Sequence, residues 1–568
     1  MSPAENLYTQ NSERKEKKSS HKENRNAAYD VLIKNGKVID GTGSPWFKAD
    51  IAISNGKIVK MGRIAEKADL VIDAYGLIVS PGWVDFHSHS DLTLLRYPHA
   101  DSDLIQGATM VVTGNCGFSA APIIGDLAKK SIQKRAEGLG IKIDWSSFDE
   151  YLERLERQGV PMNVACLVGH NTIRTCVMGY EERPANDEEI ARMKKLIADS
   201  MKAGAFGMST GLVFPPGCWA DTHELIELSK TVAEHDGIYV SHIRGERETN
   251  IEATKELIKI GEEAEVRVHR SHMQSKYPVF GNAEKVLKLM EEARERGVDV
   301  ACDTDAFPWI GFNAVNQLPP LHLTSFAQGR SLVELLRNPK TREEFKKRML
   351  EMSPYDPLGR TGQGGIYQKR AWDRVWIYEC RSDPSVEGKK ISEISRERKI
   401  DPEDVLFDLI EQEEGRGPKL VVAYIEDDHR ITAPNSLCIF PSTDGSVVET
   451  DKIPPRYFQF SPEWLSMFPR VLSRYVKEEH LMSIEEAIRR MTSFACQRLR
   501  IFDRGIIRPG MWADLTIFDF KKIKSKGDFD NPQQFPEGIE YVLVNGQLAV
   551  EKGEYTGIQA GKVMRHHA

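Results

Sequence analysis

Between residues 81 and 504, short apolar runs alternate with longer stretches in which apolar residues recur every three or four positions. The short runs predict eight β-strands: the first ends at His87 and His89, and the others cover residues 109–113, 163–168, 205–209, 238–241, 266–269, 298–302 and 436–440. The longer stretches predict amphipathic helices at 186–203, 221–236, 248–263 and 282–297. Alternating strands and helices are typical of a parallel α/β fold, and eight such units predict a (β/α)8 TIM-like barrel.

The two ends of the chain share a different pattern, in which short apolar strands are accompanied by Asn-Gly pairs. Asn35-Gly36 and Asn55-Gly56 each predict a tight turn between two strands. Short apolar strands and an Asn-Gly pair recur near the other terminus. We therefore expect residues 29–80 and 505–568 to form one small β-sandwich domain built from both chain ends.

Two segments lie outside these patterns. Residues 1–28 are polar and almost free of apolar side chains, so we expect a disordered tail. About 130 residues, roughly 306–435, separate the seventh and eighth strands. Because structureless loops of that length are uncommon, and because 330–352 and 402–413 have helical patterns, we expect a folded, lid-like insertion. The glycine-rich segment 359–365 does not fit a phosphate loop and predicts a hinge or turn.

Composition narrows the class of protein. The 568 residues carry a formal net charge of -7, which gives no indication of nucleic-acid binding. There is no apolar run of about 18 residues and no signal-peptide pattern at the start, so no membrane partner is expected. Eight scattered cysteines without a CxxC pair fit a reduced, cytoplasmic enzyme. The oligomeric state stays open, with a homo-oligomer as one outcome.

Side chains that bind metals recur where the predicted strands end. In the segment Val84–His89, His87 and His89 are two positions apart, so a strand presents both imidazoles to the same side. By itself such a pair is equally consistent with polar surface. Barrels place catalytic groups at the C-terminal ends of their strands, and His87, His89, Cys116, His242, His272 and Asp444 all fall there. Imidazole, thiolate and carboxylate are the ligands that zinc prefers.

Several of these segments resemble a known family. Pro81–His89 resembles the opening motif of the amidohydrolase superfamily, and Gly114–Ser119 resembles its D-aminoacylase (N-acyl-D-amino-acid deacylase) branch. Ser241–Glu246, Ser442–Gly445 and Arg504–Asp514 agree with that branch, and the resemblance covers roughly residues 29–560. It implies a metal-dependent hydrolase of C–N amide bonds that acts on small N-acyl amino acids.

The resemblance also implies a ligand set. Cys116, His242 and His272 would hold a tightly bound zinc ion, and His87, His89 and Asp444 would face a second, weaker position, with Cys116 able to bridge the two. Many relatives in the superfamily bridge their metals with a lysine from the fourth strand, but residues 204–210 contain none and Lys202 lies on the preceding helix. For Cys116, the competing interpretation is a small buried hydrophobe.

The expected reaction is amide hydrolysis by metal-activated water, with Asp444 acting first as general base and then as general acid. A turn residue is the competing interpretation of Asp444, since Asp-Gly favours turns. By resemblance, Arg456 would bind the substrate carboxylate, with a solvated loop arginine as the competing interpretation. The chain departs from the family at three substrate-binding positions, namely Gln274, Phe307 and Asn313. We therefore expect an altered pocket around that carboxylate.

Two other functions are consistent with the same barrel. One is a cyclic-amide hydrolase of the hydantoinase or dihydropyrimidinase type, or a dipeptidase. The absence of a fourth-strand lysine and the segment Gly114–Ser119 argue against it. The other is a non-catalytic scaffold, which would have lost metal ligands, whereas none is missing here.

Overall fold

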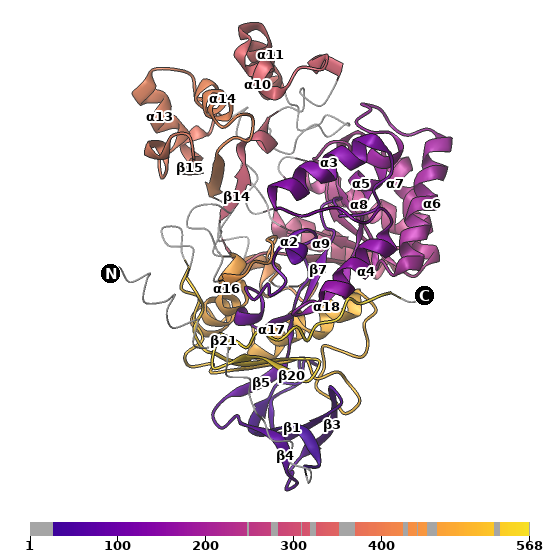
Figure 1. Ribbon diagram of the computed structural model, residues 1–568, viewed down its shortest axis with the longest axis vertical. Helices are drawn as coiled ribbons and strands as arrows, with labels where there is room; N and C mark the ends of the chain where they lie inside the picture. The colour runs from indigo at the N-terminus through magenta and orange to yellow at the C-terminus, as the bar shows by residue number, and fades with distance from the viewer. Residues whose placement is uncertain are drawn as a thin grey trace.

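The fold has three parts that follow one another along the long axis of the molecule (Figure 1). The computed structural model describes residues 27–246, 249–273, 282–307, 309–318, 325–351, 370–423, 430–439, 441–450, 463–527 and 534–566. A β-sheet lies at one end, a layer of parallel strands wrapped by helices fills the middle, and the inserted segment lies at the other end. Among the described residues, no helix is both long and apolar enough to cross a membrane.

The middle part is built on parallel strands that match the eight predicted ones. They are β6 Trp83–Asp85, β7 Ala108–Thr113, β8 Asn163–Cys166, β9 Val168–Gly169, β10 Gly207–Gly211, β11 Ile238–His242, β12 Arg267–Arg270, β13 Val300–Asp303 and β17 Cys438–Ile439. The hydrogen-bonded orders are β6-β7-β8 and β9-β10-β11-β12-β13-β17. Only Leu167 separates β8 from β9, so the third predicted strand belongs to both sheets.

The first and last of these strands also meet. A parallel bridge joins Ser88, just after β6, to Gly445, just after β17. The N–H of Asp444 donates to the carbonyl of His87 at 2.9 Å, and the N–H of His89 donates to the carbonyl of Gly445 at 2.6 Å. The ends of strands that are about 350 residues apart in the chain are thereby held at one edge.

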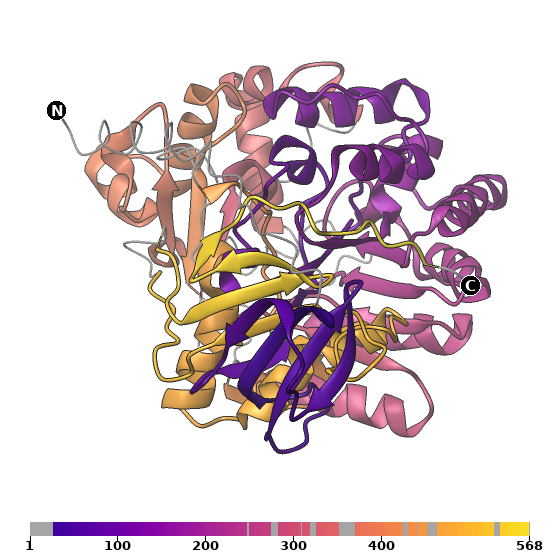
Figure 2. The same cartoon turned by 60° about the horizontal axis from the view of Figure 1, so that its bottom comes forward.

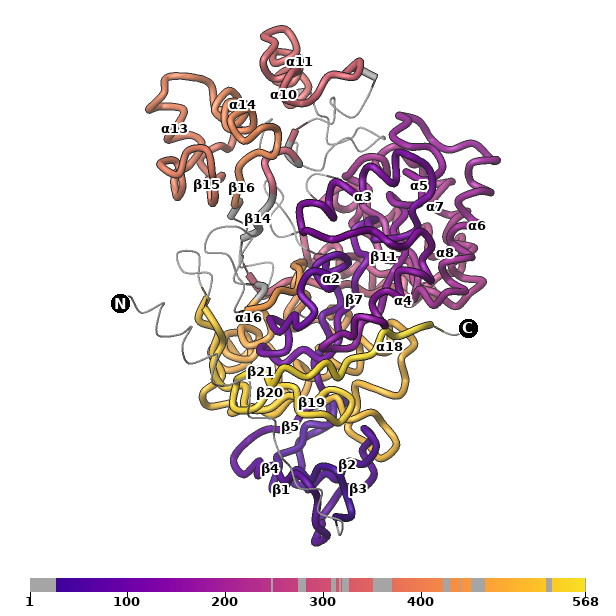
Figure 3. The backbone as a smooth tube through the Cα atoms, viewed as in Figure 1, coloured from indigo at the N-terminus to yellow at the C-terminus, as the bar shows by residue number. Residues whose placement is uncertain are grey.

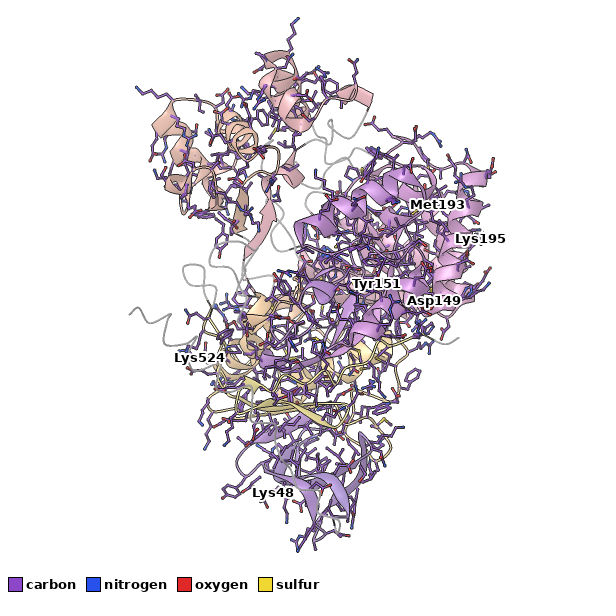
Figure 4. All side chains as sticks on the ribbon, viewed as in Figure 1. Lys48, Asp149, Tyr151, Met193, Lys195 and Lys524 are labelled. Carbon is purple, nitrogen blue, oxygen red and sulfur yellow. The ribbon has the colours of Figure 1, made fainter. Side chains whose placement is uncertain are left out.

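Amphipathic helices cover these strands from outside (Figure 1). They are α3 Gly125–Gly138, α4 Phe148–Gln158, α5 His170–Val177, α6 Asp187–Ala203, α7 Thr222–Glu234, α8 Asn250–Ala264, α9 Ala283–Glu295, α17 Ile484–Met491 and α18 Ser493–Arg498. In α6, Met193 is fully buried whereas the Lys195 side chain projects outward (Figure 4). Asn186 and Glu189 close a reciprocal capping box at its start, which satisfies N–H groups that the helix leaves unpaired.

Both chain ends contribute to one nine-stranded sheet, as the indigo and yellow strands of Figure 2 show. Its strands are β1 Tyr29–Val38, β2 Phe47–Ser54, β3 Lys57–Gly62, β4 Ala68–Asp73, β5 Ile78–Pro81, β18 Leu515–Phe518, β19 Ile539–Val544, β20 Gln547–Glu551 and β21 Glu554–Tyr555. Their order is β21-β20-β19-β18-β5-β1-β2-β3, with β4 beside β1. The antiparallel pair β5–β18 is where the two ends of the chain join.

The two Asn-Gly pairs near the N-terminus behave differently. Asn55-Gly56 forms the predicted turn between β2 and β3, with φ of 51° and 75°. The turn predicted at Asn35-Gly36 is wrong, because β1 continues through both residues and only shifts register against β2 between Ile33 and Gly36. Asn35, at φ 62°, is accommodated as a bulge because the Asp50 carboxylate accepts its N–H at 2.9 Å.

The insertion is folded and has its own core. Its antiparallel strands are β14 Trp309–Asn313, β16 Lys419–Ala423 and β15 Val375–Glu379, in that order across the sheet. The helices are α10 Leu332–Arg337, α11 Pro339–Glu351, α13 Ile391–Arg398 and α14 Pro402–Gln412. The helix expected over 330–352 is interrupted at Asn338, whose backbone is extended because Pro339 follows it. The glycine-rich segment 359–365 lies outside the described residues.

The last described residues leave the terminal sheet and run along the middle part (Figure 3). Val563 forms a parallel bridge with Val164 of β8. Arg565 pairs with Asp149 and Glu156 on α4, and Asp149 is labelled in Figure 4. The C-terminal segment therefore joins the terminal sheet to the outside of the middle part.

Candidate metal centre

The six candidate ligands come together at the C-terminal ends of the parallel strands. His87 and His89 follow β6, Cys116 follows β7, His242 ends β11, His272 follows β12 and Asp444 follows β17. Cys116, His272 and Asp444 have left-handed backbones, with φ of 49°, 31° and 48°. Such conformations are unfavourable for residues with a side chain and cluster at functional sites.

Close packing explains the glycines beside Cys116. Gly114 has φ 84°, and a Cβ placed on it would lie 2.0 Å from the carbonyl oxygen of Leu167. Gly117 has φ 80°, and its N–H donates to the hydroxyl of Ser209 on β10 at 3.0 Å. The turn between β7 and α3 thus lies directly against the neighbouring strands, and this fixes the position of the Cys116 sulfur.

Three imidazoles surround the sulfur of Cys116. Sγ lies 3.3 Å from His87 Nε2, 3.5 Å from His272 Nε2 and 3.6 Å from His242 Nδ1. All four side chains are buried. The donor atoms of His87, Cys116, His272 and Asp444 all lie within 4.8 Å of one another.

Asp444 and His89 form the more open side of the cluster. Asp444 Oδ1 lies 3.0 Å from His89 Nε2 and 3.4 Å from His87 Nε2. The Asp444 side chain is 20% exposed and that of His89 is 32% exposed, whereas the His87 side chain has no exposed surface. This side of the cluster is therefore the one exposed to solvent.

Interactions among these groups shift their pKa values toward the charged forms. Burial alone raises the pKa of the Cys116 thiol, but the charge of His87 and contacts with His242 and His272 hold that pKa well below its usual range. Burial likewise opposes the protonation of His272, yet Glu246 and Cys116 raise its pKa to about 10. For Asp444, burial is outweighed by His89, His272 and His87, so its pKa lies below the usual value. The site is therefore suited to hold a thiolate, a carboxylate and a cation together.

The residues present fit zinc. A Zn–S bond of ~2.3 Å and a Zn–N bond of ~2.0–2.1 Å at a tetrahedral angle place sulfur and nitrogen roughly 3.5 Å apart. The three distances from Cys116 Sγ, between 3.3 and 3.6 Å, match that separation. The fourth parallel strand, β10, contains no lysine, and Lys202 lies on α6 with an exposed side chain.

Two buried carboxylates that the sequence analysis did not identify lie beside the ring nitrogens that face away from the Cys116 sulfur. Asp303, which ends β13, lies 3.6 Å from His87 Nδ1 and accepts the backbone N–H of His272 at 2.9 Å. Glu246 lies 2.8 Å from His272 Nδ1 and 3.4 Å from His242 Nε2. Asp303 could have been found as the last residue of the seventh strand, and Glu246 from its spacing of four residues after His242.

Two further histidines pair with carboxylates away from the sulfur. His269 Nε2 lies 3.0 Å from Asp303 Oδ2. Burial lowers the pKa of His269 to about 4 in spite of that carboxylate. His170 lies 2.8 Å from Glu224 and belongs to a buried pair with that residue.

Two of the four predicted substrate-binding residues, Phe307 and Asn313, belong to the described part of the chain. Phe307 is fully buried, and the guanidinium of Arg470 lies 4.4 Å from the centre of its ring. Asn313 ends β14, and its side chain accepts the backbone N–H of Val315 at 2.8 Å. Gln274 and Arg456 lie outside the described residues. The substrate contacts of these four residues stay predictions.

The sequence is similar to known proteins over most of its length. A sequence profile of the amidohydrolase family matches residues 70–233 and 460–550. A D-aminoacylase of Alcaligenes xylosoxydans xylosoxydans is 31% identical over 542 residues, which cover 95% of this chain and 98% of that protein.

Two solved structures are similar over nearly their whole length. The N-acyl-D-glutamate deacylase of Bordetella bronchiseptica, in complex with zinc and a phosphonate that mimics the tetrahedral intermediate, superposes with a TM-score of 0.76, at 27% identity over 94% of this chain and 99% of that one. A D-aminoacylase described for the functional role of its binuclear metal centre gives a TM-score of 0.75, at 28% identity over 94% of this chain and 100% of that one.

Proposed function

The chain belongs to the D-aminoacylase branch of the amidohydrolase family, and from that premise we propose that it is a zinc-dependent hydrolase of N-acyl-D-amino acids. It acts on C–N amide bonds outside peptides and releases a carboxylic acid and a free D-amino acid. The observation that supports this most strongly is the Cys116 sulfur, which three imidazoles approach within 3.3 to 3.6 Å while Asp444 lies at the open side.

We infer that the parallel strands form a (β/α)8 barrel over residues 81–504 and that residues 29–80 and 505–568 form the composite β-sandwich domain. The strand orders and the bridge between Ser88 and Gly445 support the first inference, and the β5–β18 pair supports the second. The insertion at about 306–435 is proposed as the lid, and residues 1–28 as a tail.

The proposed tight zinc site consists of Cys116, His242 and His272. His87, His89 and Asp444 form the second, weaker site, with Cys116 between the two. The division into a tight and a weak site follows the resemblance to the family; the approach of His87, His242 and His272 to Sγ supports the place of Cys116 between the two sites, and the close contacts of Asp444 with His87 and His89 support their grouping. A relative whose metal centre is described as binuclear, with one-metal activation and second-metal attenuation, supports it as well.

The residues of the chain account for the proton transfers of the proposed amide hydrolysis. When bound, zinc lowers the pKa of a coordinated water to about 7 and polarises a carbonyl. Asp444 accepts the proton of the attacking water, and the new C–O bond forms as that proton leaves. Asp444 then donates the proton to the amide nitrogen, which departs as the amine when the C–N bond breaks. The lowered pKa of Asp444 keeps it ionised for the first of these steps.

Arg456 is the proposed partner of the substrate carboxylate, because a guanidinium pairs with a carboxylate through two parallel hydrogen bonds. Phe307, Gln274 and Asn313 are the proposed positions that alter this pocket relative to the family. Phenylalanine cannot donate the hydroxyl hydrogen bond that a tyrosine offers, so we expect a substrate preference that differs from that of the relatives.

A panel of substrates tests the proposal. N-acyl-D- and N-acyl-L-amino acids, hydantoin and dihydrouracil are supplied to zinc-loaded enzyme, and the amine or ring-opened product is measured. We expect hydrolysis of D-compounds and none of the cyclic amides, because β10 contains no lysine that could bridge two metals. Hydrolysis of hydantoin or dihydrouracil in preference to every N-acyl amino acid would favour the cyclic-amide hydrolase instead.

A further inference from the structure

Glu246 faces two metal-site histidines from the side opposite the cysteine. His272 directs Nε2 toward Cys116 Sγ at 3.5 Å and Nδ1 toward Glu246 Oε1 at 2.8 Å. His242 directs Nδ1 toward Cys116 Sγ at 3.6 Å and Nε2 toward Glu246 Oε2 at 3.4 Å. Each imidazole therefore has one nitrogen on the sulfur side and the other on the carboxylate side.

The two oxygens of Glu246 serve different rings. A neutral imidazole carries one N–H and one lone pair, and a metal takes the lone pair. An N–H directed at a carboxylate leaves the lone pair on the opposite nitrogen, which here is the one beside Cys116. The carboxylate is nearly as inaccessible as the imidazoles, since the Glu246 side chain is 5% exposed and that of His272 is 3% exposed.

We propose that Glu246 is a positioning residue that fixes His242 and His272 in the orientations and tautomers that bind zinc. This inference rests on the proposed zinc site. A carboxylate in this role raises the basicity of the ligands and contributes to metal affinity, and its loss typically costs 10–100-fold. Glutamine cannot replace it, because an amide offers one acceptor oxygen and would turn N–H donors toward the second ring.

His242, Glu246 and His272 also lie close enough together to hold a metal ion, and the short contact with His272 favours positioning over direct ligation. A nitrogen and an oxygen bound to the same zinc at a tetrahedral angle lie roughly 3.4 Å apart. Glu246 Oε1 and His272 Nδ1 are 2.8 Å apart, which is shorter than that separation and lies within hydrogen-bonding distance.

The test compares zinc affinity in three variants of the full chain. Glu246→Gln removes one acceptor, and Glu246→Asp retains the carboxylate on a shorter side chain. The matched control is Glu256→Gln, because Glu256 pairs with Arg244 at 3.0 Å in the same region without approaching the imidazoles. Zinc affinity is measured by competition with a chromophoric chelator, and the absorption spectrum of the cobalt-loaded protein reports the ligand geometry.

We expect Glu246→Gln to lower zinc affinity 10–100-fold and to alter the cobalt spectrum, Glu246→Asp to recover part of the loss, and Glu256→Gln to stay within threefold of the wild type. Equal affinity in Glu246→Gln and wild type would overturn the inference, as would equal losses in Glu246→Gln and Glu256→Gln. If the wild type itself binds no zinc, the proposed function fails together with the inference, and that outcome is recognised before any variant is compared. Thermal unfolding of the metal-free variants identifies any loss of affinity that comes from misfolding. A Glu246→Asp variant that folds but binds zinc no more tightly than Glu246→Gln also counts against the inference.

Discussion

Asp85 accepts two hydrogen bonds from Thr443, one from its backbone N–H at 2.9 Å and one from its hydroxyl at 2.6 Å. Asp85 ends β6 and Thr443 directly precedes Asp444, so these bonds join segments that are 358 residues apart. Both residues are buried. The position of Asp444 therefore depends on a carboxylate at the end of the first parallel strand.

Replacing that carboxylate should displace Asp444. We expect Asp85→Ala to lower kcat roughly 100-fold, because misplacing a catalytic group by about 1 Å is sufficient for such a loss. The matched control is Asp101→Ala, since Asp101 accepts the same pair of bonds from Thr450, at 2.7 and 2.6 Å. Both variants lose two hydrogen bonds, so their thermal stabilities should fall together. Equal kcat values in the two would contradict the positioning role of Asp85.

Asp444 itself is expected to control proton transfer. Asp444→Asn keeps the size of the side chain but removes the base, so kcat should fall by about 10²–10⁴-fold while KM changes little. The zinc content of the purified variant, measured beside the wild type, separates lost proton transfer from lost metal. A variant that retains zinc and more than about a tenth of the wild-type kcat would show that another group moves the proton.

A buried ion-pair network behind α5 should make stability depend on pH. Glu224 lies 2.8 Å from His170 and 2.5 Å from Arg174, and none of these side chains is exposed. Burial raises the pKa of Glu224, but His170 and Arg174 outweigh it and lower that pKa to about 2. Because the folded pKa lies below the unfolded value, this stabilisation is complete above about pH 4.5 and is lost as the pH falls toward 2.

The expected size follows from that shift. Glu224→Gln should cost about 3 kcal/mol of unfolding free energy at pH 7. Urea unfolding between pH 7 and pH 3 should show a constant difference from wild type down to about pH 4.5 and a shrinking difference below it. Glu227→Gln, on the same helix, removes a more exposed carboxylate paired with Lys194 and Lys230 and should cost less than about 1 kcal/mol. A difference that persists unchanged at pH 3 would exclude this linkage.

Much of the fold could be predicted because its strands are apolar runs with polar ends. Thr109–Thr113 became β7 and Ile238–Ser241 became most of β11, since each run is buried on both faces between neighbouring parallel strands. The bulge at Asn35-Gly36 could not be predicted in the same way. An Asn-Gly pair favours a left-handed backbone both in a turn and in a bulge, and only the pairing with β2 decides between them.

The ligands of the site could be predicted from the sequence, whereas the carboxylates that support them could not. Histidines and a cysteine at strand ends are uncommon enough to be recognised, and His87, Cys116 and His272 do converge. Asp85, Asp303 and Glu246 were missed because a carboxylate that supports a ligand has no sequence pattern of its own. Their roles depend on which strand lies beside which, and that follows from the order of strands in the parallel sheets rather than from neighbours in the chain.

The most direct test of the central claim is a zinc titration of the metal-free protein in which hydrolysis of an N-acyl-D-amino acid is followed at each addition. We predict that activity is absent without metal, rises as zinc binds at the site of Cys116, and is not recovered in Cys116→Ala. Cys166→Ala removes a buried thiol from β8 instead and should titrate like the wild type. Full activity in the metal-free protein, or a Cys116→Ala variant that titrates like the wild type, would contradict the account.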